Sequence, residues 1–178
     1  MDKWQKDLTD TIGAEVKRLR EKESRSTMWL QDETERLGFR VSRSSISQLE
    51  AGNRTSISLA EVLVLAAALD IPPALLIFPY YPDGETHYLP GKIDSAFNAV
   101  EWVAGQRTLE SDDIGVFPEP RVMLATERDD LLSDALRKIK TDPGNPMGHV
   151  KAMNARAKEI ATELKKLTPY VGTSEDEQ

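Results

Sequence analysis

The chain has 178 residues, 23 basic and 30 acidic side chains, and a formal net charge of −7. It contains no cysteine and only two histidines, which excludes a disulfide framework, a cysteine nucleophile and a zinc site built from thiolates or clustered histidines. Its longest apolar runs are far shorter than the roughly 20 residues that span a bilayer, and no signal-peptide pattern opens it. These properties predict a soluble cytoplasmic protein, and the bulk charge argues against nucleic-acid binding.

The acidity is unevenly distributed along the chain. Residues 1–79 contain 11 Lys/Arg and 12 Asp/Glu, whereas residues 80–178 contain 12 and 18. Between residues 38 and 55, three arginines accompany a single acidic residue, Glu50. A local basic strip of this kind suits contact with a polyanion.

Apolar residues at three- and four-residue steps predict five short helices in residues 1–79. The first ends near Lys22, and Gly13 is expected to weaken its middle. Its apolar stripe consists of Trp4, Leu8, Ile12, Val16 and Leu19. Ser26 fits the N-cap of a second helix that carries Leu30 and ends at Gly38.

The third and fourth helices have clear start and stop signals. Ser42 can cap a helix that buries Ile46 and Leu49 and ends at Gly52. The run Ser58-Leu59-Ala60-Glu61 matches a capping box that opens the fourth helix. Its inward residues are predicted to be Leu59, Val62, Leu63, Ala66 and Leu69. A short apolar fifth helix begins at Pro72-Pro73 and runs to Phe78.

The second half predicts connectors and two long helices. Turn residues gather at 79–84 and 105–120, and between them Asp94 can cap a helix with Phe97, Val100 and Ala104 on one face. Beyond Pro120, the spacing of Leu124, Arg128, Leu132, Ala135 and Ile139 predicts one long helix. Residues 142–146 break it, and a second long helix follows with heptad spacing at Val150, Met153, Ala157, Ile160, Leu164 and Leu167. Together they predict an antiparallel hairpin. Its two helices can pack on each other within one chain, on a second copy in a dimer, or both.

The third helix carries the most specific functional signal. If Ile46 and Leu49 face the core, the opposite face presents four side chains that are short or able to form hydrogen bonds: Arg43, Ser44, Ser47 and Gln48. A helix that enters the DNA major groove needs such donors, since arginine can bind guanine O6 and N7 and glutamine can bind adenine N6 and N7. Asn53 and Arg54, just past the helix, are placed to hold phosphates. Arg40 either meets phosphate or remains in solvent.

Residues 12–78 resemble the lambda-repressor/Cro-like, or Xre-type, helix-turn-helix family. The resemblance rests on the order of a cap, a buried pair, a stop glycine and a following helix. It is carried by Ile12-Gly13, Leu19-Arg20, the run from Ser42 to Arg54, Ser58-Leu59-Ala60-Glu61, Ala66-Ala67-Ala68-Leu69 and Pro72-Pro73-Ala74-Leu75-Leu76.

The resemblance implies roles for particular residues. Arg43, Ser44 and Gln48 match its base-reading face, which Ser47 borders, and Thr27 matches a position that binds phosphate. Arg20 and Glu50 match an ion pair that joins the first and third helices. With Thr27, the predicted phosphate contacts are Arg40, Ser45, Asn53 and Arg54. The turn at residues 38–41 is longer than that of the simplest relatives, so the second and third helices can be placed differently here.

We therefore predict an all-α protein. Residues 1–79 form a five-helix DNA-binding domain, 80–120 a linker with one short helix, 121–168 a helical hairpin for oligomerisation or partner binding, and 169–178 a disordered acidic tail. The predicted function is that of a sequence-specific transcriptional repressor, bacterial or prophage-type, that binds double-stranded operator DNA as a homodimer through its C-terminal helices.

Two other functions are open at this stage. The chain could be an antitoxin-like or adaptor protein whose C-terminal helices bind a protein partner, or a regulator gated by a ligand in an apolar pocket within residues 80–120. The acidic doublets Asp112-Asp113 and Asp129-Asp130 have no accompanying nucleophile or phosphate loop. We therefore predict no enzymatic activity, no cofactor and no metal.

Overall fold

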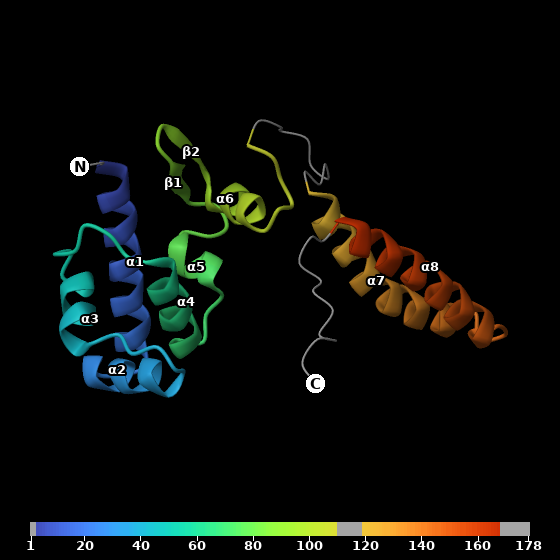
Figure 1. The fold of residues 1–178 in the computed structure, drawn as a ribbon, viewed down its shortest axis with the longest axis horizontal. Coiled ribbons are helices and arrows are strands. Elements are labelled where there is room, and N and C mark those ends of the chain that lie inside the picture. The colour runs from blue at the N-terminus through green and yellow to red at the C-terminus, as the bar shows by residue number, and fades with distance from the viewer. Residues whose placement is uncertain (1–2, 110–118, 168–178) are drawn as a thin grey trace, which may run out of the picture. The chain divides into compact units, whose positions relative to one another are not determined.

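A computed structural model describes residues 3–109 and 119–167 of the chain. The chain divides into two compact units, Met1–Ala104 and Gly105–Gln178. The described residues are mostly helical, with one two-stranded sheet (Figure 1). This agrees with the predicted helical fold class and adds one small β-hairpin to it. No described helix is both long and apolar enough to cross a membrane.

Five helices open the first unit: α1 (Lys3–Lys22), α2 (Thr27–Arg36), α3 (Arg43–Glu50), α4 (Leu59–Ala68) and α5 (Pro73–Ile77). Their predicted start signals are confirmed. The hydroxyls of Ser26 and Ser42 accept from Trp29 N and Ser45 N, and Ser58 with Glu61 forms the complete capping box of α4. Each cap satisfies a backbone donor that has no partner inside its helix, which fixes where the helix begins.

One hydrophobic core joins these five helices. Its fully buried side chains come from all of them and include Ile12, Val16, Leu30, Ile46, Leu49, Leu65 and Leu76. Because Ile46 and Leu49 are buried here, the rotation of α3 about its own axis is fixed.

The predicted inward face of α4 is partly wrong. Leu59 and Leu63 are 70% and 49% exposed, and Val64, Leu65 and Ala68 are buried together with Val62 and Ala66. The reason is that α4 is apolar almost all round, so the spacing of its apolar residues does not single out one face.

Residues 80–104, predicted as part of a linker, lie in the first unit. They form β1 (Glu85–Leu89), β2 (Lys92–Ser95) and α6 (Ala96–Val103). The two strands are antiparallel with an irregular register, so they lack the long alternation that would reveal them in sequence. Trp4 Nε1 donates to the His87 carbonyl at 2.8 Å, which ties the hairpin to α1.

The start and the inward face of α6 also differ from the prediction. Ser95, and not Asp94, is the N-cap, and its hydroxyl accepts from Asn98 N. Ala96 and Ala99 are the buried residues, whereas Phe97 is exposed and lies against the Tyr81 ring. Small residues face inward because α6 packs directly on the Phe78–Tyr88 cluster.

The second unit contains α7 (Pro120–Thr141) and α8 (Pro146–Leu167), which pack together as the predicted hairpin. Leu124, Ala135 and Ile160 are its buried side chains, and Arg156 donates to the Glu127 carboxylate at 2.7 and 3.0 Å across the pair. Leu132 of α7 is 58% exposed. The predicted acidic tail at 169–178 and the doublet Asp112-Asp113 lie outside the described residues.

Candidate nucleic-acid interface

The exposed face of α3 is a row of hydrogen-bonding side chains. Arg43, Ser44, Ser47 and Gln48 are all exposed, opposite the buried pair Ile46 and Leu49. Among the described residues, the side chains of Arg43 and Gln48 have no ion pair or hydrogen bond partner, so their donors are available to a ligand. The one acidic residue of α3, Glu50, is turned away into an ion pair.

That ion pair connects α3 to α1. The Arg20 guanidinium donates to both carboxylate oxygens of Glu50 at 2.7 Å, and the two side chains are only 11% and 8% exposed. The hydrogen bonds to Glu50 raise the pKa of Arg20 above its ordinary value. Arg20 also donates to the Arg25 carbonyl at 2.7 Å, so the pair holds the α1–α2 turn as well. Breaking one partner of such a pair would leave an uncompensated buried charge.

Gly13 sets how closely α1 and α3 approach. A Cβ atom at this position would lie 2.3 Å from the Leu49 carbonyl oxygen, which is much too close. From the sequence alone, this glycine only lowers helix propensity. In the structure, it allows the backbone at the end of α3 to pack directly against α1. The backbone contact explains its place at a buried position.

The chain just after α3 is held by α1. Gly52 has a φ of +68°, which ends the helix, and its carbonyl accepts from Lys6 Nζ at 2.9 Å. Lys6 also pairs with Asp10, so its charge is shared with a carboxylate. Asn53, the next residue, is exposed and its backbone N–H donates to the Gln48 carbonyl at 2.9 Å.

Arg54 has a partner within the protein. Its guanidinium donates to both carboxylate oxygens of Glu61 at 2.7 and 2.9 Å, and both side chains are largely buried. The hydrogen bonds from Arg54 lower the pKa of Glu61 to about 2. The contact braces the α3–α4 segment and competes with the phosphate contact predicted for Arg54.

The other predicted phosphate residues differ in their availability. Thr27 is the first residue of α2 and is half-buried, and Arg40 is exposed with its Nε 3.6 Å from the Glu35 carboxylate. The Ser45 hydroxyl lies 3.0 Å from the Ser42 hydroxyl, inside the cap of α3.

Two buried polar residues of α2 were not identified as site residues from the sequence. Gln31 is 8% exposed, and its side-chain oxygen accepts from the backbone N–H of Arg43 at 3.0 Å. Thr34 is fully buried, and its hydroxyl accepts from Val41 N at 3.0 Å. The sequence does carry a sign of these residues: both are polar on the inner face of an amphipathic helix. Their partners, Val41 N and Arg43 N, lie beyond the α2–α3 turn, so only the fold brings them together.

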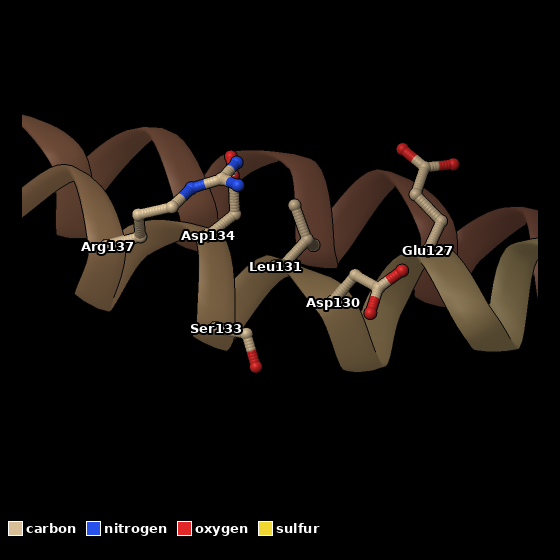
Figure 2. Close-up of a pocket in the computed structure, with 6 residues that line it drawn as sticks. All are labelled: Glu127, Asp130, Leu131, Ser133, Asp134 and Arg137. Carbon is tan, nitrogen blue, oxygen red and sulfur yellow. The ribbon is translucent and has the colours of Figure 1, made fainter.

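Two hollows of the described surface lie away from this face. One of about 550 Å³ runs beside α7, and Figure 2 shows that its lining residues all come from this helix: Glu127, Asp130, Leu131, Ser133, Asp134 and Arg137. Its acidic lining is unsuited to phosphate. A hollow between α1 and β1, lined in part by Tyr80, Thr86 and His87, measures about 140 Å³, below the roughly 300–1,000 Å³ of ordinary ligand pockets.

Comparison with known proteins finds a match that lies within the first unit. Residues 11–76 match a family described as a helix-turn-helix domain. No curated protein and no solved structure matches the chain. The matched range contains α2, α3 and the exposed face described above, and a domain of this kind indicates a DNA-binding regulator. The chain therefore carries a helix-turn-helix domain over residues 11–76, consistent with the lambda-repressor/Cro-like, Xre-type family.

Proposed function

We propose that this protein is a sequence-specific transcriptional repressor that reads operator DNA in the major groove through α3. The observation that carries the proposal is the exposed row of Arg43, Ser44, Ser47 and Gln48 on a helix that is fixed at both ends. Arg43 would bind a guanine and Gln48 an adenine, because these side chains match the paired acceptors and donors of those bases.

The contacts to phosphate would come from residues around this row. Thr27, Arg40 and Asn53 are the candidates, since Arg54 is already engaged by Glu61. Contacts to phosphate would set the register of the domain on the duplex and supply a salt-dependent part of the affinity, and contacts from α3 to bases would add the sequence preference.

A single short helix reads few base pairs, so the repressor would act as a homodimer. The α7–α8 hairpin supports this role, because five large apolar side chains among its described residues are more than 40% exposed. They are Met123, Leu132, Leu136, Met147 and Leu167. A second copy packed on this surface would remove them from water. The dimer would present two α3 helices about 34 Å apart, to half-sites one helical turn apart, and would block a promoter sterically.

The decisive experiment is selection of binding sites from a random pool of DNA duplexes with the purified full chain. The expected result is a palindromic site whose half-sites are one turn apart, bound with an affinity that falls steeply with salt. Arg43→Ala should lower affinity for the selected site by about 5- to 150-fold, the value of one bidentate base contact, and change non-specific binding little.

The matched control is Arg121→Ala. Arg121 is an exposed arginine of the second unit that pairs with Glu119, and its loss should leave site preference unchanged. Equal binding of the wild-type chain to all sequences at every salt concentration would contradict the proposed function.

A further inference from the structure

The connection between α2 and α3 is six residues long, from 37 to 42, and α2 itself holds it in place. At its start, Gly38 has a φ of +91°, its N–H donates to the Glu35 carbonyl, and Phe39 N donates to the Thr34 carbonyl. These two bonds form a Schellman motif, which ends α2 and fixes the direction of the departing chain. The next residues are exposed until Val41, which is buried.

Side chains of α2 bind the far end of the same connection. The Thr34 hydroxyl accepts from Val41 N at 3.0 Å and donates to the Gln31 carbonyl at 2.8 Å. One turn earlier on α2, Gln31 Oε1 accepts from Arg43 N at 3.0 Å. Since a backbone N–H is a donor, the atom that faces it must be the amide oxygen, and Gln31 Nε2 accordingly points to the Asp32 carboxylate at 3.3 Å.

The partner of Gln31 is the backbone of the first base-reading residue. α3 is only eight residues long and Arg43 is its first residue, so a bond to Arg43 N sets where the base-reading row begins relative to α2. Ser42 caps the same turn from within the connection, through Ser45 N. Gln31 adds an attachment to the body of the domain, and its burial limits the movement of that attachment.

We infer that Gln31 is a positioning residue for sequence discrimination: its side-chain oxygen holds the first turn of α3 in the register that lets Arg43 read a base. This inference rests on the proposed function and names a residue that acts through Arg43, without itself contacting DNA. Thr34 supports the same connection at Val41. Contacts to phosphate tolerate small displacements, whereas a bidentate base contact requires fixed geometry; loss of the Gln31 bond should therefore reduce discrimination more than overall binding.

The test compares two substitutions of similar size in the full chain. Gln31→Met fills the same space without an acceptor, and Gln31→Glu keeps an acceptor but adds a negative charge. Each variant is titrated with the duplex selected by the wild-type chain and with a scrambled duplex of the same length and composition. Exchange of the Arg43 amide hydrogen is followed by NMR, and the melting temperature is recorded.

Gln31→Met is expected to lower affinity for the selected duplex at least tenfold, keep affinity for the scrambled duplex within about twofold, and speed Arg43 amide exchange. Gln31→Glu is expected to keep the ratio of the two affinities and the slow exchange, while weakening both affinities through charge repulsion. Gln5→Met, an exposed position on α1, is the matched control and should change none of these quantities.

Two results would overturn the inference while leaving the proposed function intact. The first is a Gln31→Met variant with a lower melting temperature but an unchanged affinity ratio, which would make Gln31 a purely structural residue. The second is an equal loss of the ratio in Gln31→Met and Gln31→Glu, which would exclude the acceptor as the cause. A wild-type chain without sequence preference would instead reject the proposed function, and the inference with it.

Discussion

Gly13 is the residue at which the backbones of α1 and α3 come closest. In an exposed helix, replacing glycine by alanine adds about 1 kcal/mol of stability. Here the added methyl would lie 2.3 Å from the Leu49 carbonyl oxygen, which is backbone and cannot rotate away. The steric cost should therefore exceed the gain in helix propensity.

Gly13→Ala is expected to lower the free energy of unfolding by about 1–3 kcal/mol, the usual cost of overpacking. Thermal or urea denaturation measures it. Ala14→Gly is the matched control: Ala14 is the exposed neighbour on the same helix, and its replacement should cost about 1 kcal/mol through propensity alone. A Gly13→Ala variant that is more stable than the wild type would show that α1 and α3 do not pack at this distance.

Glu61 makes the free energy of unfolding depend on pH at acidic pH. The hydrogen bonds from Arg54 lower its pKa from 4.5 to about 2 in the folded chain. A carboxyl whose pKa is lowered by folding stabilises the fold fully above its unfolded pKa, and this contribution disappears as the pH falls through the folded value. The loss therefore falls between pH 4.5 and about 2.

Glu61→Gln should be less stable than the wild type at pH 7, by about 1–3 kcal/mol, and the difference should shrink as the pH falls from 4.5 towards 2. Urea denaturation at several pH values measures this difference. Glu35→Gln, at an exposed position of α2, should follow the wild-type curve closely. If the difference between the Glu61→Gln and wild-type curves stayed constant from pH 7 to about 2, the lowered pKa of Glu61 would not contribute to stability.

At the scale of the element, the α7–α8 hairpin has a small core of its own. Only Leu124, Ala135 and Ile160 are buried among its described residues, and large apolar side chains remain outside. Leu132 and Leu136 lie four positions apart on α7 and are 58% and 52% exposed, so they share one face of that helix. This face is the surface we expect a second copy to cover.

The double change Leu132→Glu and Leu136→Glu should convert a dimer into a monomer, because it would place four charges in the interface of two copies. Sedimentation velocity measures the oligomeric state. The variant should keep the helix content of the hairpin, as judged by circular dichroism. Ser133→Glu, at an exposed α7 position between the two leucines, is the control and should remain dimeric. A wild-type chain that is monomeric at all concentrations would contradict this use of the hairpin.

At the scale of the whole molecule, the two units divide the proposed work. The first, Met1–Ala104, holds the helix-turn-helix domain with the β-hairpin and α6 packed on it, and the second holds the hairpin. The acidic second half of the sequence would limit non-specific attraction to DNA.

A fragment of residues 1–104 should therefore unfold cooperatively and keep the sequence preference of the full chain. Its affinity for the full palindrome should fall by about 100-fold or more, because the second half-site is no longer bound by a linked copy. Titration of full and half-site duplexes with both proteins measures this. Fusing the fragment to an unrelated dimeric coiled coil should restore part of the loss, which separates dimerisation from any direct contact of the hairpin with DNA.

The sequence by itself determined the first five helices, α1 to α5, and which face of α3 is exposed. Caps, stop glycines and proline pairs act over three or four residues, so Ser42, Ser58 and Gly52 could be interpreted without the fold. The buried pair Ile46 and Leu49 then fixed which face of α3 points outward. The α7–α8 hairpin followed from the heptad spacing and the break at residues 142–146.

The tertiary structure alone decided contacts between residues distant in sequence. It gave Gly13 a close neighbour, engaged Arg54 with Glu61, and placed Gln31 against Arg43 N. It also turned Leu59 and Leu63 of α4 outward, because the pattern of an almost wholly apolar helix does not say which side meets a neighbour. Local signals fix where a helix begins and ends; which side chains become buried, paired or available depends on the elements that pack against it.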